Sequence, residues 1–129
     1  MSRTNLRAIL AIAAVAFALR SGTAILTEVK PIFPAYYYTD AVFIDQYARE
    51  TVETWALGHH LFLAYSPTQR THILLTALIY QVAGPRPIAA KLVNALAASL
   101  GIAAFGLLAM RIFGPLVGMI STALLGLWP

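Results

Sequence analysis

Two long apolar segments constrain this chain more than any other feature of its sequence. They run from about residue 5 to 26 and from 88 to 110, and each contains few charged side chains. A helix of about 20 apolar residues crosses the ~30 Å hydrocarbon core of a bilayer. Because 60% of the residues are hydrophobic and only 11% are charged, the bilayer is the expected solvent. We therefore predict an all-α membrane protein.

A third apolar segment brings the expected number of transmembrane helices to about three. The predicted single membrane domain, residues 1–129, has spans at 5–26, 88–110 and 116–129 and an external loop at 27–87. The third segment is short for a span, so we expect further helices to follow it. Arg20, near the outer end of the first span, either snorkels to the interface or faces protein, and the sequence leaves both interpretations open.

The loop at 27–87 differs from its flanks because it holds all five acids, all three histidines and five of the seven prolines. Asp40 to Trp55 has apolar residues at three- and four-residue spacing, which predicts an amphipathic helix capped by Thr39 or Asp40. The apolar run from His72 to Ala83 is short, so we favour an interfacial or buried helix over a crossing one. A Gly-Pro-Arg-Pro sequence then stops it. The loop is thus expected to carry juxtamembrane helices.

The basic residues indicate the orientation of the chain. If residues 72–83 do not cross, Arg3, Arg7 and Arg111 share one side, which the positive-inside rule makes cytoplasmic. The loop then lies on the external face of an inner or plasma membrane, in a multi-pass protein. If residues 72–83 do cross, Arg111 moves to the external side, and the excess of basic residues on the cytoplasmic side becomes smaller. No small-residue cleavage site follows the first apolar run, so an uncleaved signal-anchor helix is favoured.

Composition and missing motifs exclude several classes of function. The sequence has no cysteine, so it can form neither a disulfide nor a thiolate metal site. The net charge of +4 is spread along the chain rather than gathered in a run, which argues against a nucleic-acid partner. The spacing of His59, His60 and His72 matches no zinc site. Neither a Gly-rich phosphate loop nor a nucleophile elbow occurs.

Several short motifs, taken in order, resemble a known family. They are Arg20 near the end of the first span, the segment Tyr38-Thr39-Asp40-Ala41-Val42-Phe43-Ile44-Asp45-Gln46-Tyr47-Ala48, Gly84 followed seven positions later by Lys91, and the Arg111-Ile112-Phe113-Gly114 turn before a small-residue helix ending in Pro129. This order resembles the N-terminal part of the GT-C superfamily of integral-membrane glycosyltransferases. The likeness is to protein mannosyltransferases and, since Ala41 follows Asp40, more to the bacterial aminoarabinose transferase. It covers nearly the whole chain but only about the first quarter of a typical member.

The resemblance implies a glycosyltransferase, or an N-terminal fragment of one, that transfers a sugar from a polyprenyl-phosphate donor to an acceptor on the external face. Asp40 would be the general base, because such a transfer needs a carboxylate to accept the proton of the acceptor hydroxyl. Arg70 and Lys91 would bind the donor phosphate. The expected substrate contacts are Tyr38, Asp45, His59 and His60. Expected partners are membrane lipid, the donor and the missing C-terminal helices or partner subunits; the use of a divalent cation is left open.

Each of these residues also has a plainer interpretation. Asp40 suits a helix cap, which is compatible with catalysis. Asp45 lies one and a half turns beyond Asp40 and faces away from it, which favours a solvated or structural role. Arg70 and Lys91 suit snorkelling to headgroups. The histidines suit interfacial positions or contacts with the acceptor rather than a metal site.

A second function from another class remains open at this point. The segments from Ile88 to Met110 and from Met119 to Gly126 are rich in small residues, which let helices approach closely. A small non-catalytic membrane protein that assembles with partner helices would have such faces.

Overall fold

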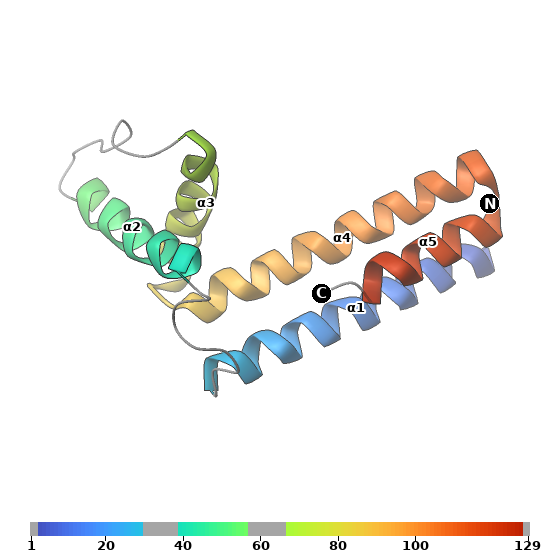
Figure 1. Cartoon of the computed structure of the whole chain (residues 1–129), viewed down its shortest axis with the longest axis horizontal. Coiled ribbons are helices and arrows are strands. Elements are labelled where there is room, and N and C mark those ends of the chain that lie inside the picture. The colour runs from blue at the N-terminus through green and yellow to red at the C-terminus, as the bar shows by residue number, and fades with distance from the viewer. Residues whose placement is uncertain (1–2, 30–38, 57–66, 128–129) are drawn as a thin grey trace. The chain divides into compact units, whose positions relative to one another are not determined.

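The structure is a computed structural model that describes residues 3–29, 39–56 and 67–127, and within these ranges it is almost entirely helical (Figure 1). The helices are α1 (Arg3–Val29), α2 (Thr39–Ala56), α3 (Pro67–Ala83), α4 (Pro87–Phe113) and α5 (Pro115–Leu127). The described ranges contain no strand. The all-α prediction is therefore confirmed for this part of the chain.

The chain divides into two compact units. The first, which we call the span unit, comprises Met1–Leu26 and Lys91–Pro129. The second, the loop unit, comprises Thr27–Ala90 and so contains α2, α3 and the first turn of α4.

Two helices in the described ranges, α1 and α4, are long and apolar enough to cross a membrane, as the sequence predicts. Each has 27 residues, which at 1.5 Å per residue gives roughly 40 Å. Only 17% of the most apolar stretch of α1 and 33% of that of α4 is buried. The core helix of a soluble protein would be mostly buried, so these exposed apolar surfaces favour lipid as their surroundings.

The third predicted span, at 116–129, is not among the candidate spans of the described ranges. The corresponding helix, α5, has 13 residues, or roughly 20 Å, which is shorter than the ~30 Å hydrocarbon core. Its hydropathy is that of a span, which explains why the sequence suggested one. The described ranges thus hold two candidate spans, not three.

Small residues bring the helices of the span unit together. The buried face of α5 consists of Gly118, Thr122 and Gly126, each four residues from the next. A Cβ atom added at Gly118 would lie 2.8 Å from the Cα of Met110 and 2.9 Å from the carbonyl oxygen of Gly106, both on α4. On the α1 side, a Cβ at Gly126 would be 3.4 Å from the Cβ of Ala16. Packing this close is typical of small-residue helix interfaces in membranes.

Arg20 holds the C-terminal end of α5. Its two terminal nitrogens donate to the carbonyl oxygens of Gly126 at 3.0 Å and Leu125 at 3.3 Å. The last carbonyls of a helix have no partner within the helix. A cation there also interacts favourably with the negative end of the helix dipole. Of the two interpretations of Arg20, the structure therefore supports the contact with protein.

Glycine and proline set both helix boundaries that the sequence predicts. Gly84 (φ +79°) and Gly114 (φ +94°) adopt backbone conformations that favour glycine, and each is followed by proline. The amide of Gly114 donates to the carbonyl of Met110 at 3.1 Å, which closes the end of α4.

In the loop unit, α2 and α3 pack against each other (Figure 1). Helix α2 confirms the helix expected from Asp40 to Trp55, and α3 extends the one expected from His72 to Ala83 back to Pro67. With 17 residues, α3 is not among the candidate spans. The core contains Ala48 of α2, Ala77 and Tyr80 of α3, Ala90 of α4, and the partly buried Val52, Trp55 and Ile79.

The close contact at Gly118 predicts an asymmetry between two Gly→Ala variants. Gly118→Ala should lower the free energy of unfolding by about 1–3 kcal/mol, because backbone atoms of α4 cannot make room for the new methyl group. At Gly101 an added Cβ meets nothing within 4 Å, so Gly101→Ala should be neutral or slightly stabilising. Denaturant unfolding in detergent, followed by circular dichroism, checks this. Equal effects of the two variants would contradict the packing described for α4 and α5.

Candidate functional site

The predicted site residues fall in different parts of the chain. Asp40 and Asp45 lie on α2 and Arg70 lies in the first turn of α3, all in the loop unit, whereas Lys91 belongs to the span unit. The remaining predicted contacts, Tyr38, His59 and His60, lie outside the described residues. The structure therefore locates one candidate base and one candidate phosphate ligand within a single unit.

Asp40 is an exposed carboxylate in the first turn of α2. The helix begins at Thr39, so Asp40 follows the start of the helix rather than preceding it. The free N–H groups and the dipole of this turn stabilise a negative charge. An exposed carboxylate can accept a proton, which is what a general base must do.

Five residues further along α2, Asp45 is held by two neighbours. Its Oδ2 accepts a hydrogen bond at 3.0 Å from Nε of Arg49, one turn along the same helix. Its Oδ1 accepts a hydrogen bond from the hydroxyl of Tyr80 on α3. The guanidinium of Arg49 in turn lies 5.6 Å from the centre of the Tyr80 ring, within range of a cation–π contact. These three residues, which we call the α2–α3 clamp, join the two helices.

The electrostatics of the clamp favour one set of protonation states. The pKa of Tyr80 is raised above its ordinary range, first by burial and then by its hydrogen bond to Asp45. The pKa of Arg49 is raised by its hydrogen bond to Asp45. Near neutral pH the clamp therefore consists of a neutral phenol and a charged guanidinium, both donating to the carboxylate.

Both carboxylate oxygens of Asp45 thus have partners inside the loop unit, which supports the structural interpretation of this residue. Its predicted contact with substrate stays a prediction. Sequence reasoning missed Tyr80, although a signal was present. Ile73, Ala77 and Tyr80 share one helical face, and a tyrosine in such a buried face usually needs a partner for its hydroxyl.

Metal binding finds no support in the part of the chain that the structure describes. No group of three His, Asp or Glu side chains comes together there. The use of a divalent cation, left open by the sequence, is not tested by this observation.

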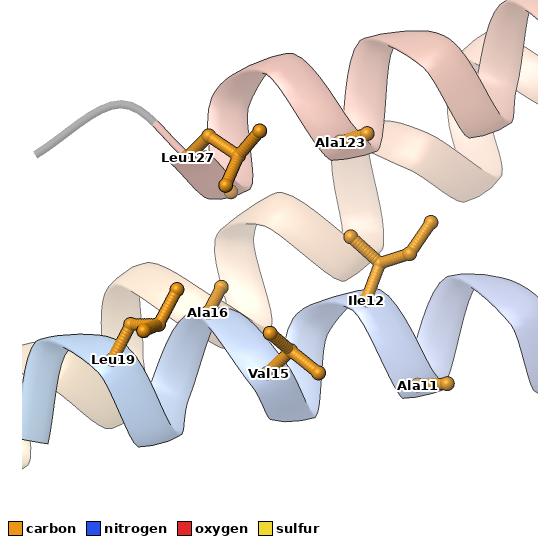
Figure 2. Close-up of a pocket in the computed structure, with 8 residues that line it drawn as sticks. Ala11, Ile12, Val15, Ala16, Leu19, Ala123 and Leu127 are labelled. Atoms are coloured by element: carbon orange, nitrogen blue, oxygen red, sulfur yellow. The ribbon is translucent and has the colours of Figure 1, made fainter.

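A concave surface lies in the span unit, between α1 and α5 (Figure 2). It has a volume of about 280 Å³. Every side chain that lines it is apolar, namely Ala11, Ile12, Val15, Ala16 and Leu19 of α1 with Ala123, Gly126 and Leu127 of α5. Figure 2 shows Ile12 and Ala16 directed toward α5. With no polar side chain in the lining, this groove offers no group for acid–base chemistry.

Comparison with known proteins finds no relative. No protein-family model, no curated protein and no solved structure matches the chain. The resemblance to the GT-C superfamily therefore rests on the motifs in the sequence alone.

The clamp predicts a stability defect in Tyr80→Phe. Loss of the hydroxyl removes a hydrogen bond to a charged acceptor, which should cost about 1–2 kcal/mol of the free energy of unfolding. The effect should also depend on pH. Because the pKa of the phenol is raised in the folded protein, the contribution of Tyr80 to stability is constant below the unfolded pKa of about 10 and falls as the pH rises above it. In Tyr80→Phe, the part of the fall in stability at alkaline pH that comes from this phenol should be absent.

Tyrosinate absorbance measured during an alkaline titration tests the assignment directly. A phenol that ionises late should be lost in Tyr80→Phe and should persist in Tyr47→Phe, the control, which removes the tyrosine of α2. A late step that survives in Tyr80→Phe would mean that another tyrosine carries the raised pKa.

Proposed function

We propose that this chain is a GT-C-like glycosyltransferase, or the N-terminal part of one, that moves a sugar from a polyprenyl-phosphate donor to an acceptor. The supporting observation is the position of Asp40. It is an exposed carboxylate at the start of a helix, in a unit that follows one candidate span and precedes another. Together with the order of the motifs, this position favours an external loop that carries the catalytic base.

In the proposed reaction, Asp40 accepts the proton of an acceptor hydroxyl as its oxygen forms a bond to the anomeric carbon. The bond between that carbon and the phosphate oxygen breaks, and the polyprenyl phosphate leaves with the electron pair. Arg70 and Lys91 neutralise the charge that develops on the phosphate. Tyr38, Asp45, His59 and His60 contact the substrates.

The proposed topology places the loop unit on the external face, with Arg3, Arg7 and Arg111 on the cytoplasmic side. It rests on the positive-inside rule and on α3 remaining outside the bilayer core. The clamp supports this part of the proposal because it fixes α3 against the acidic helix α2.

A single substitution tests the role of Asp40. In the full-length protein, Asp40→Asn should lower the rate of sugar transfer by about 10²–10⁴-fold, since the amide cannot accept the proton. Glu53→Gln is the matched control, because Glu53 is an exposed carboxylate near the other end of the same helix. Transfer from a radiolabelled polyprenyl-phosphate sugar, at equal amounts of protein in the membrane, is the measurement. Unchanged transfer by Asp40→Asn would refute the assignment of the general base.

The second candidate is a non-catalytic membrane protein that assembles with partner helices. One observation favours it: Ala97, Gly101 and Ala104 of α4 leave an exposed face of small residues. The small-residue face of α5 already packs inside the span unit. Only the face of α4 therefore supports this alternative.

The intact mass of the native protein in its source membrane separates the two candidates. A mass near 13.9 kDa would favour the assembly protein, whereas a mass several times larger would favour the transferase.

A further inference from the structure

A separate cavity lies at the end of the span unit where α1 begins, α4 ends and α5 begins (Figure 1). It is lined by Asn5 of α1, Met110 and Arg111 of α4, and Pro115 of α5. Unlike the groove between α1 and α5, it offers a cation and a side-chain amide beside apolar walls. Its volume of about 330 Å³ is several times the ~30 Å³ that a water molecule occupies in the liquid, so a phosphate group fits.

The charge of the span unit favours an anion in this cavity. The sequence of the unit has no Asp or Glu, and its basic residues are Arg3, Arg7, Arg20, Lys91 and Arg111. Because α4 ends where α5 begins, the opposite ends of two helix dipoles meet at the turn and largely cancel, so Arg111 sets the charge of the cavity. A guanidinium can donate two parallel hydrogen bonds to a phosphate, and a side-chain amide can donate another.

The surroundings of the cavity indicate the source of that phosphate. Helices α1 and α4 are candidate spans, and the cavity lies at an end that they share, where spans meet the headgroups. Ile112, Phe113 and Leu116, close in sequence to the lining residues, are 61%, 68% and 67% exposed. Exposed apolar side chains of this size suit acyl chains and gain nothing from a phosphate ion in water. A phospholipid supplies both the phosphate and the acyl chains.

We propose that this cavity binds the phosphate of an anionic phospholipid, with Arg111 as the main ligand and Asn5 as a second donor. The acyl chains of the lipid lie against the exposed Phe113 and Leu116. This inference does not depend on the glycosyltransferase proposal, because it concerns a different unit of the chain and needs no chemistry at Asp40.

Such a site differs from the general attraction between basic residues and a negatively charged membrane surface, because it requires one particular cation. Arg3 and Arg7 are exposed near the same end of the unit but do not line the cavity. At about 100° per residue, each of them lies about 160° from Asn5 around α1. They therefore sit on the other side of that helix and provide a matched control.

The test compares two variants with the same change of charge, Arg111→Gln and Arg7→Gln. Each full chain is purified in a neutral detergent, and the binding of phosphatidylglycerol and of phosphatidylcholine is measured by native mass spectrometry. Asn5→Ala removes the second donor, and inorganic phosphate is added as a competitor. Both arginines are exposed, so both variants should fold, which circular dichroism checks. The ratio of the two lipid affinities is the main readout, because a merely structural defect would not change it.

We expect phosphatidylglycerol to bind the wild type and Arg7→Gln alike, and to bind Arg111→Gln at least about tenfold more weakly, with a smaller loss in Asn5→Ala. Phosphatidylcholine should bind more weakly than phosphatidylglycerol to the wild type but not to Arg111→Gln.

Three results would overturn the proposal. Equal losses in the two arginine variants would mean that the lipid responds to the net charge of this end and not to the cavity. Equal binding of both lipids to the wild type would mean that the cavity does not select an anionic headgroup. Displacement of phosphatidylglycerol by inorganic phosphate at a similar concentration would mean that the ligand is a free phosphate and not a lipid.

Discussion

Tyr80 is the side chain on which the arrangement of the loop unit depends. It belongs to one buried cluster with Ala48 of α2, Ala77 of α3 and Ala90 at the start of α4, and its hydroxyl donates to Asp45. This residue thus combines a place in the core shared by three helices with a hydrogen bond to a charged group. A buried hydroxyl without a partner would carry a desolvation cost, so the ring can occupy this core only because Asp45 accepts from it.

The span unit follows a different physical rule. Apolar side chains gain little from meeting each other when lipid is the alternative, so close approach and polar contacts between helices matter more. Gly118, Thr122 and Gly126 provide the close approach, and Arg20 provides the polar contact at the end of α5. These two features explain how a helix of only 13 residues is held against its longer neighbours. In the loop unit, by contrast, a clamp of ionisable side chains reinforces an apolar core.

The sequence predicts the helices well because their signals are local. Length, hydropathy and the glycine–proline boundaries locate α1 and α4, and the three- and four-residue spacing of apolar residues locates α2. Hydropathy alone would count α5 as a span, but with 13 residues it is not among the two candidate spans of the described ranges. Contacts between distant residues were beyond such reasoning. Arg20 meets the end of α5 more than a hundred residues later, and Tyr80 lies 35 residues from Asp45.

For the candidate site, the sequence could nominate residues but not their partners. Asp40 keeps its predicted place at an exposed helix start, since acid near an N-terminus is a local preference. Asp45 looked like a surface residue of the same helix, and its role in the clamp depends on a tyrosine of another helix. The chemistry itself stays a prediction, because no sequence or fold relative bears on it.

The distribution of acids along the chain suits the proposed reaction. Four of the five acids lie on α2, and Asp40 is exposed in its first turn. A carboxylate buried in hydrocarbon would carry a prohibitive cost for its charge. An exposed Asp40 between two candidate spans in the sequence avoids that cost, because an acceptor can reach it without the carboxylate entering the acyl chains.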